Sequence, residues 1–286
     1  MTHEENERLN HFIAAALAED VGDGDHTSLA TIPGGKVGEA QLIIKERGIL
    51  AGLEEAVAVF RRVDAMLAVT TLVPDGRAVQ VGDVVLRVKG SIHSILVAER
   101  LVLNIMQRMS GIATITHQVV TALEGTGTKV LDTRKTTPLL RFLEKKAVVI
   151  GGGVNHRFGL YDMMLIKDNH VDYAGGIREA VERANQYRNG MIDPIAIEVE
   201  VRNLDEIKQV LEVGGVERIM LDNFSPAQVR DAVDLINGRF VTEASGGITD
   251  ENVYGYAEAG VDYISIGALT HSVKSLDMSL KAKLVD

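Results

Sequence analysis

Five basic side chains lie at or near the ends of apolar segments that we predict to be buried strands. They are Arg134, Lys135, His156, Arg157 and Lys167. Cations that meet at one place repel one another unless an anion joins them. The planar guanidinium group of arginine binds carboxylate and phosphate groups through paired hydrogen bonds. We therefore predict a site for a ligand with several negative charges. The alternative is that each cation pairs with a carboxylate at the surface.

Three consecutive glycines, Gly151 to Gly153, precede the pair His156 and Arg157. Glycine permits sharp turns and a close approach of the backbone to a ligand, at a cost in conformational entropy. We expect these glycines to let the loop come close to the anionic ligand. The alternative is an ordinary polar turn at the surface.

Carboxylates follow a similar pattern on the next predicted strands. Glu198 and Glu200 lie in one of them, and Asp222 lies near the end of the next. Residues two apart in a strand point to the same face, so Glu198 and Glu200 should both face inward. Oxygen ligands beside an anion site suit Mg²⁺ shared with a substrate phosphate, whereas zinc would call for cysteine or paired histidines. The alternative, that a carboxylate only neutralises a lysine, stays open for Glu198.

Glycine-containing segments follow the last two predicted strands. They are "EASGGI" at 243–248 and "SIGALTHS" at 265–272. Backbone N–H groups in such loops, together with a helix N-terminus, can hold a phosphate. Because β/α barrels often bind phosphate after their last strands, we predict a phosphate site here.

Six apolar segments alternate with amphipathic helical patterns in the second half of the chain. The expected strands are 129–133, 163–168, 195–201, 218–223, 239–244 and 263–268. This alternation predicts parallel strands covered by helices. Polar residues end nearly every strand, which favours a β/α barrel over a doubly wound sheet, because the sheet would place fewer strands at its site. We expect an incomplete β/α (TIM-like) barrel over 114–271, or a further strand hidden in 147–153.

The first part of the chain, 1–113, has the pattern of an α/β sandwich domain. Strand patterns with glycine-rich turns occur in 38–52 and 81–94, and a helix is expected at 53–63. A second helix, 94–111, is strongly apolar and carries one polar stripe. The stripe consists of Arg100, Asn104, Gln107 and Arg108. It is either a solvated face or a face at a subunit interface or site. We expect the final residues, 272–286, to return to this domain.

The composition narrows the choice of partners. Of the 286 residues, 46% are hydrophobic, 4% are aromatic and none is cysteine, and the formal net charge is −10. An acidic protein with few aromatic residues suits neither a nucleic acid nor a membrane surface, so we expect small-molecule ligands. The absence of cysteine excludes disulfides and thiol nucleophiles. The acidic start "MTHEENERLN" does not resemble a signal peptide, and we predict a cytoplasmic protein.

These residues fit two classes of reaction. One is transfer at a carbon atom of a phosphosugar. The other is an aldolase-type lyase reaction that uses Lys167 to form a Schiff base. A third hypothesis is a phosphosugar-binding protein without catalytic activity.

Eight motifs extend over essentially the whole chain. They are "EDVGDGDHTS", "AERLVLNIMQRMSGIAT", "DTRKTTP", "EKKAVVIGGGVNHRFGLYDMMLIKDNH", "EVEV", "MLDNF", "EASGGI" and "SIGALTHS". With them the sequence resembles the quinolinate phosphoribosyltransferase family, also called nicotinate-nucleotide pyrophosphorylase (decarboxylating). The resemblance implies a type II phosphoribosyltransferase with an N-terminal α/β domain, an incomplete barrel, Mg²⁺ and a homodimer or higher homo-oligomer. The implied reaction joins quinolinate and 5-phosphoribosyl-1-pyrophosphate (PRPP) to give nicotinate mononucleotide, pyrophosphate and CO2 in NAD biosynthesis.

The resemblance also implies roles for individual residues. The quinolinate carboxylates would be bound by Arg134, His156, Arg157, Lys167 and, from the neighbouring subunit, Arg100. Residues with a part in catalysis would be Lys135 and Lys167 at PRPP, and Glu200 and Asp222 at Mg²⁺ and the ribose hydroxyls. The 5-phosphate would be held by Ser245, Gly246, Gly247 and Gly267, with His271 nearby.

One residue departs from the family pattern, and two related activities are the alternatives. Lys146 stands where members of the family carry an aromatic residue, and we expect this to change local packing only. Nicotinate phosphoribosyltransferases share the barrel, and a branch associated with molybdenum transport is also similar. The full set of cations together with Arg100 favours quinolinate, because a dianion needs more cations than nicotinate does.

Overall fold

The computed structural model describes residues 2–283, which fall into two compact units. The first unit contains the residues up to Ile115, the segment Thr137–Gly152 and the residues from Val273 onward. The second contains Thr116–Thr136 and Gly153–Ser272. The segment 137–152, which we had placed in the barrel, thus belongs with the first unit. Residues 284–286 of the predicted returning tail lie outside the described part.

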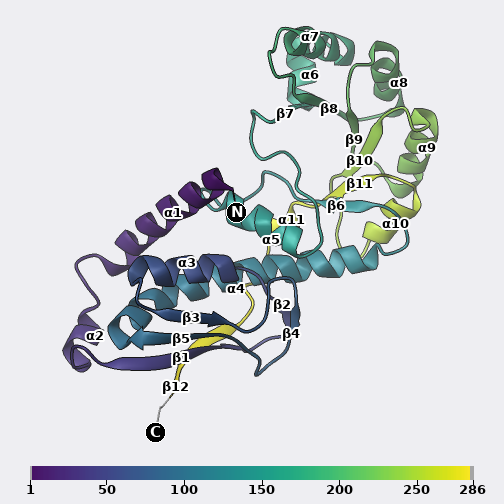
Figure 1. Cartoon of the computed structure of the whole chain (residues 1–286). Helices are drawn as coiled ribbons and strands as arrows, with labels where there is room; N and C mark the ends of the chain where they lie inside the picture. The colour runs from purple at the N-terminus through teal and green to yellow at the C-terminus, as the bar shows by residue number, and fades with distance from the viewer. Residues whose placement is uncertain (1, 284–286) are drawn as a thin grey trace. The chain divides into compact units, whose positions relative to one another are not determined.

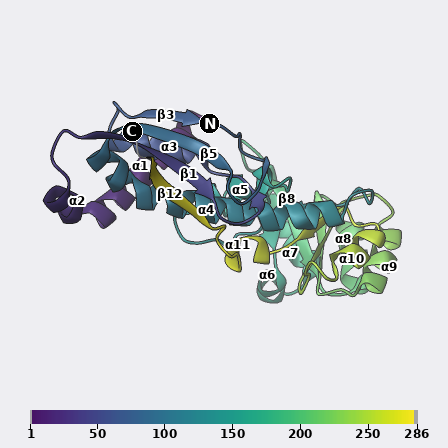
Figure 2. The same cartoon turned by 90° about the horizontal axis from the view of Figure 1, so that it is seen from below.

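The first unit is built on an antiparallel sheet with strand order β12-β1-β5-β3. Its elements are α1 (His3–Val21), α2 (His26–Thr31), β1 (Val37–Ile44), β2 (Gly48–Ile49), α3 (Leu53–Val63), β3 (Ala68–Thr71), β4 (Ala78–Val79), β5 (Val84–Ser91), α5 (Arg141–Ile150) and β12 (Met278–Lys283), with the larger part of α4 (Ile92–Ala122). Strand β12, from the C-terminal tail, lies along β1 in both views (Figure 1 and Figure 2). Gly111 lets this tail cross α4 closely, because a Cβ atom there would overlap the carbonyl oxygen of Lys274.

The polar stripe of α4 is divided between the surface and the interior. Arg100 and Asn104 are exposed. In contrast, Gln107 donates a hydrogen bond to the carbonyl oxygen of Met278 (3.0 Å). Arg108 donates two to the carboxylate of Glu144 (2.8 and 3.1 Å). Since Glu144 is fully buried, Arg108 neutralises a charge inside the unit, and neither of our alternatives describes the whole stripe.

The second unit is an incomplete β/α barrel, as predicted. Its elements are the end of α4, β6 (Lys129–Leu131), β7 (Met163–Ile166), α6 (Asp168–Ala174), α7 (Ile177–Asn189), β8 (Ala196–Val201), α8 (Leu204–Val213), β9 (Arg218–Asp222), α9 (Pro226–Ile236), β10 (Val241–Ser245), α10 (Val253–Glu258), β11 (Tyr263–Ser265) and α11 (Ala268–His271). The six strands are parallel, in the order β6-β11-β10-β9-β8-β7. Helices α7 to α10 lie outside the strands (Figure 1).

The barrel is not closed by a further strand in 147–153. That segment holds the end of α5 and the glycines after it, and the adjoining Val154 forms a single bridge to Leu131. Local sequence signals explain the helices around the site more simply. Asn203 caps α8 by accepting backbone N–H bonds, and Ser225 caps α9 in a capping box followed by a proline. Among the described residues, no helix is both long enough and apolar enough to cross a membrane.

Lys146 anchors α5 to α3 in the first unit. Its Nζ atom lies 2.6 Å from Oε2 of Glu54 and 2.7 Å from Oε1 of Glu55. Burial opposes the charge of Lys146, but the hydrogen bonds with the two carboxylates outweigh it and raise the lysine pKa. Glu55 is 1% exposed, so Lys146 is a counter-charge for a buried carboxylate.

Replacing Lys146 by alanine should lower the free energy of unfolding by about 2 kcal/mol, because Glu55 would stay buried without its counter-charge. In a thermal melt we expect Tm to fall by about 5 °C. Lys208 and Asp205 form an exposed pair at 2.7 Å, so Lys208→Ala is the matched control and should leave Tm within about 1 °C. Equal Tm values for the two variants would show that the ion pairs of Lys146 contribute nothing to stability.

Candidate functional site

A pocket of about 780 Å³ lies at the carboxyl ends of the barrel strands. Every predicted site residue except Arg100 lines it. These residues are Arg134, Lys135, His156, Arg157, Lys167, Glu200, Asp222, Ser245, Gly246, Gly247, Gly267 and His271. They come from the ends of all six strands and from the loop before β7, as a barrel site requires. Arg100 is exposed on α4, in the part of that helix that belongs to the first unit.

Two arginines carry positive charge into the same part of the pocket. Burial, and then the nearby charge of Arg134, lower the pKa of Arg157. Two guanidinium groups therefore repel each other at a half-buried place, which an anionic ligand would relieve. Arg157 is held there by a hydrogen bond from Nη1 to the carbonyl oxygen of Met163 (3.0 Å).

The glycine triplet has a different role from the one we expected. Gly151 caps the C-terminus of α5, and Gly152 has a φ of +95°. Left-handed backbone after a helix is the usual place for glycine. The glycines therefore end α5 and turn the chain into the second unit, and the residues that line the pocket are His156 and Arg157 further along.

Another part of the pocket contains Lys167 together with two carboxylates, those of Glu200 and Asp222. Nζ of Lys167 lies 2.7 Å from Oε2 of Glu200. Burial, and then repulsion by Glu200, raise the pKa of Asp222. The ring of His170 accepts a hydrogen bond from the backbone N–H of Lys167 through Nδ1 (3.0 Å). This hydrogen bond fixes the start of α6 and the backbone of Lys167.

Glu200 and Asp222 fit a bound Mg²⁺ ion. Their mutual repulsion is the condition that a divalent cation would relieve, and both offer the oxygen ligands that Mg²⁺ prefers. In such a site the protein usually supplies one or two carboxylates, and water and substrate oxygens supply the other ligands. Mg²⁺ at this place stays a prediction.

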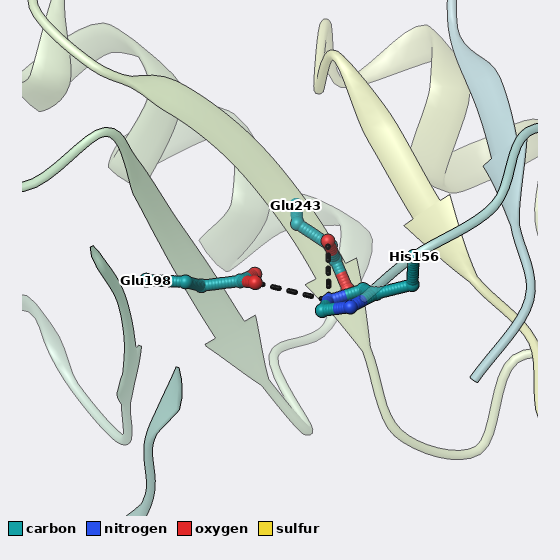
Figure 3. Close-up of side chains that lie close together, drawn as sticks. All are labelled: His156, Glu198 and Glu243. Carbon is teal, nitrogen blue, oxygen red and sulfur yellow. Dashed lines mark ion pairs between the residues drawn. The ribbon is translucent and has the colours of Figure 1, made fainter. Parts of the chain in front are cut away.

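A second group of charged residues lies deeper, at the floor of the pocket. Nε2 of His156 is 2.9 Å from Oε2 of Glu198 and 3.5 Å from Oε2 of Glu243. Figure 3 shows the imidazole ring pointing toward both carboxylates, which come from β8 and β10. Both glutamates are fully buried. Arg218 reaches the same group, with Nη1 2.7 Å from Oε2 of Glu243.

The buried pair of carboxylates is electrostatically strained at neutral pH. Burial, and then the charge of Glu198, raise the pKa of Glu243 to about 7. Burial likewise raises the pKa of Glu198, against the opposing charge of Arg218. Part of the group is therefore protonated near pH 7.

This raised pKa predicts a pH dependence of stability. From its ordinary value of 4.5 up to about 7, Glu243 binds more protons in the folded state than in the unfolded chain. The stabilisation by protonated Glu243 is therefore fully present below pH 4.5 and is lost as the pH rises toward about 7. It amounts to a free energy of unfolding on the order of 3 kcal/mol. Glu243→Gln cannot ionise, so Tm of the wild type should fall relative to that of the variant between about pH 4.5 and 7. Parallel Tm profiles of the two proteins would contradict the raised pKa.

Glycines shape the loops on the side of the pocket where we predict the 5-phosphate. Gly246 has a φ of +95°, and a Cβ atom there would overlap the side-chain amide of Asn223. Gly247 has a φ of +63°. On the other loop, a Cβ atom at Gly267 would be 3.1 Å from both His271 and Lys135. The chain is thus close-packed around the position where we predict the 5-phosphate.

Sequence reasoning missed the role of the deeper group. Glu198 was left open as a partner of a lysine, but its nearest basic partner in the structure is His156. Glu243 lies in the segment "EASGGI", which we predicted as part of a phosphate site, and neither Glu243 nor Arg218 was predicted as a partner of His156. The available signal was a glutamate in the middle of each of two apolar strands, because a buried carboxylate needs partners inside the fold.

The chain is similar over its whole length to proteins of one family. The family model described as quinolinate phosphoribosyl transferase, C-terminal domain, matches residues 112–281, and the N-terminal domain model matches residues 25–110. A relative from Nicotiana tabacum, quinolinate phosphoribosyltransferase (decarboxylating) 1b, is 47% identical, with 96% of this chain and 82% of the relative aligned. Nicotinate-nucleotide pyrophosphorylase (carboxylating), chloroplastic, from Arabidopsis thaliana is 48% identical over the same shares.

The fold agrees with these sequence comparisons. The crystal structure of NadC from Streptococcus pyogenes superimposes with a TM-score of 0.92 at 40% identity, covering 98% of each chain. The chain therefore belongs to the quinolinate phosphoribosyltransferase family.

Proposed function

We propose that the protein transfers the phosphoribosyl group of PRPP to quinolinate with loss of CO2, giving nicotinate mononucleotide and pyrophosphate. The observation that carries this proposal is the gathering of Arg134, Arg157 and Lys167 along one pocket at the ends of the barrel strands. Burial, and then the charge of Arg134, lower the pKa of Arg157 there. A pyridine with two adjacent carboxylates offers two negative charges, which two arginines can bind through paired hydrogen bonds. The names of the relatives support the same substrate.

Different residues of the pocket would bind the two substrates. Arg134 and Arg157 would bind and orient the carboxylates, and Lys135 and Lys167 would bind the pyrophosphate of PRPP and stabilise its departure. Bound Mg²⁺ would supply further positive charge to the leaving pyrophosphate. The loops with Gly246 and Gly267 would hold the 5-phosphate.

The chemistry at the ribose carbon develops positive charge. When the bond to pyrophosphate breaks, this carbon becomes oxocarbenium-like, and Glu200 and Asp222 are the nearby carboxylates that would stabilise it. The pyridine nitrogen then forms the new bond and becomes positively charged. The carboxylate next to that nitrogen leaves as CO2, and its electron pair is stabilised by the ring cation before a proton replaces it.

The aldolase hypothesis receives less support from the site. Schiff-base formation needs a neutral amine, whereas the 2.7 Å contact with Glu200 suits an ammonium group on Lys167. A test of the proposed function compares two substrates. The purified protein, with PRPP and Mg²⁺, is given quinolinate or nicotinate, and nicotinate mononucleotide is measured. Product from quinolinate alone is the expected result. Product from nicotinate alone would show that Arg134 and Arg157 do not serve to bind a dicarboxylate. No product from either substrate would refute the proposal.

Assembly as a homo-oligomer belongs to the same proposal. In this proposal Arg100 reaches the site of a neighbouring subunit, and its exposure on α4 supports that role. Arg100→Ala and Lys167→Ala should each be nearly inactive alone. In a re-equilibrated equal mixture, half the dimers are mixed and carry one intact site, so about a quarter of wild-type activity should return. A mixture no more active than its components would contradict a shared site. The cytoplasmic location stays a prediction.

A further inference from the structure

The barrel contains three fully buried acidic residues that the proposed chemistry does not use. Asp132, Glu198 and Glu243 all have 0% exposure. A carboxylate in the middle of an apolar strand costs free energy unless other groups compensate it. All three contact His156, which lines the pocket.

These acids hold His156 from two directions. Oδ1 of Asp132 accepts a hydrogen bond from the backbone N–H of His156 (2.8 Å). On the other side, Nε2 of the ring faces Glu198 and Glu243 at 2.9 and 3.5 Å (Figure 3). Backbone and ring of His156 are therefore both fixed to the interior of the barrel.

His156 in turn holds Arg157. Its Nδ1 atom accepts a hydrogen bond from the backbone N–H of Arg157 (2.7 Å). An accepting Nδ1 places the ring proton on Nε2, toward the two carboxylates. A displaced ring would thus release the backbone of Arg157, whose guanidinium lines the pocket.

Glu243 is itself held from the far side. Nη1 of Arg218 is 2.7 Å from its Oε2 atom, and the guanidinium of Arg218 lies 4.6 Å from the centre of the Tyr263 ring. His156, Glu198 and Glu243 have the spacing of a metal site. However, a cation between them would have to displace both the Nε2 proton and Arg218, so the protein already supplies the positive partners.

We propose that Glu198 and Glu243 are positioning residues, which hold the ring of His156 and through it place Arg157 for the dicarboxylate substrate. This inference rests on the proposed function. Misplacing a binding group by a fraction of an ångström weakens the one substrate that it contacts. The loss should therefore fall on quinolinate and spare PRPP.

The test compares truncated and conservative variants of the full-length protein. In Glu198→Ala and Glu243→Ala, KM for quinolinate should rise about tenfold or more, while KM for PRPP changes less than about twofold. Glu198→Gln and Glu243→Gln keep an oxygen toward the ring, so they should restore KM to within about threefold of wild type. Glu206→Ala is the matched control, because Glu206 is a buried carboxylate of the same unit that pairs with Arg202 away from the pocket. We expect this variant to lose stability without a change in either KM.

The outcomes separate this inference from the function on which it rests. Binding of PRPP, measured by calorimetry, shows that a variant is folded, and the glutamine variants serve if an alanine variant does not fold. Equal increases in both KM values, or a fall in Tm alone, would overturn the positioning role while wild-type turnover leaves the proposed function intact. A stoichiometric metal ion in the wild type that is lost in Glu243→Gln would overturn it as well. A wild type inactive with quinolinate would refute the proposed function and this inference together.

Discussion

Arg157→Ala should raise KM for quinolinate by about 100-fold, because the variant loses a charge-assisted, two-pronged contact with a carboxylate. The pKa of Arg157 is already lowered by burial and by Arg134, against the nearby charges of Glu198 and Asp162, so a carboxylate of the ligand would find a positive charge in a half-buried place. KM for PRPP should change by less than about threefold. Steady-state kinetics with each substrate varied in turn measures both values.

The control for this variant is an arginine of the same unit that lies outside the pocket. Arg202 comes after β8 and pairs with Glu206 at 2.8 Å, and it does not line the pocket. Arg202→Ala should leave both KM values unchanged. Equal losses for quinolinate and PRPP in Arg157→Ala would contradict the assignment of this arginine to the dicarboxylate.

Lys167→Ala should lower kcat by about 1000-fold, because the variant loses a positive charge beside the leaving pyrophosphate. The contact of 2.7 Å between Lys167 and Glu200 also means that the substitution leaves a largely buried carboxylate without its partner. Lys167→Arg retains the charge and should recover part of the rate. Single-turnover measurements separate the chemical step from product release.

The same lysine distinguishes transfer from Schiff-base chemistry. Borohydride should trap no substrate adduct on the wild-type protein, since the amine acts as a cation rather than as a nucleophile. A stable adduct at Lys167 would support the aldolase hypothesis. A decrease in kcat below tenfold in Lys167→Ala would show that its charge is not needed for the reaction.

The residues at the strand ends could be predicted from the sequence for a physical reason. Each strand has its own local pattern of apolar residues, and a parallel barrel gathers the carboxyl ends of all its strands. Arg134, Lys167 and Asp222 could therefore be placed together without knowing which strands are neighbours. The structure places them along the same pocket.

Contacts that depend on side-chain packing could not be predicted in this way. The approach of His156 to Glu198 and Glu243 joins residues from a loop and two separate strands, and it depends on the path of the chain between them. Likewise, the segment around α5 has the amphipathic pattern of a helix but no local signal that it joins the first unit. Its partners, such as Phe12 against Phe142 with ring centres 5.9 Å apart, are distant in sequence.

The most direct test of the account follows the three products of the reaction together. Quinolinate labelled in the carboxylate next to the ring nitrogen is mixed with PRPP, Mg²⁺ and the wild-type protein, and labelled CO2, pyrophosphate and nicotinate mononucleotide are measured together. The account predicts equal amounts of all three, at every time point of the steady state. Pyrophosphate released without CO2, or a nucleotide that keeps the label, would contradict it.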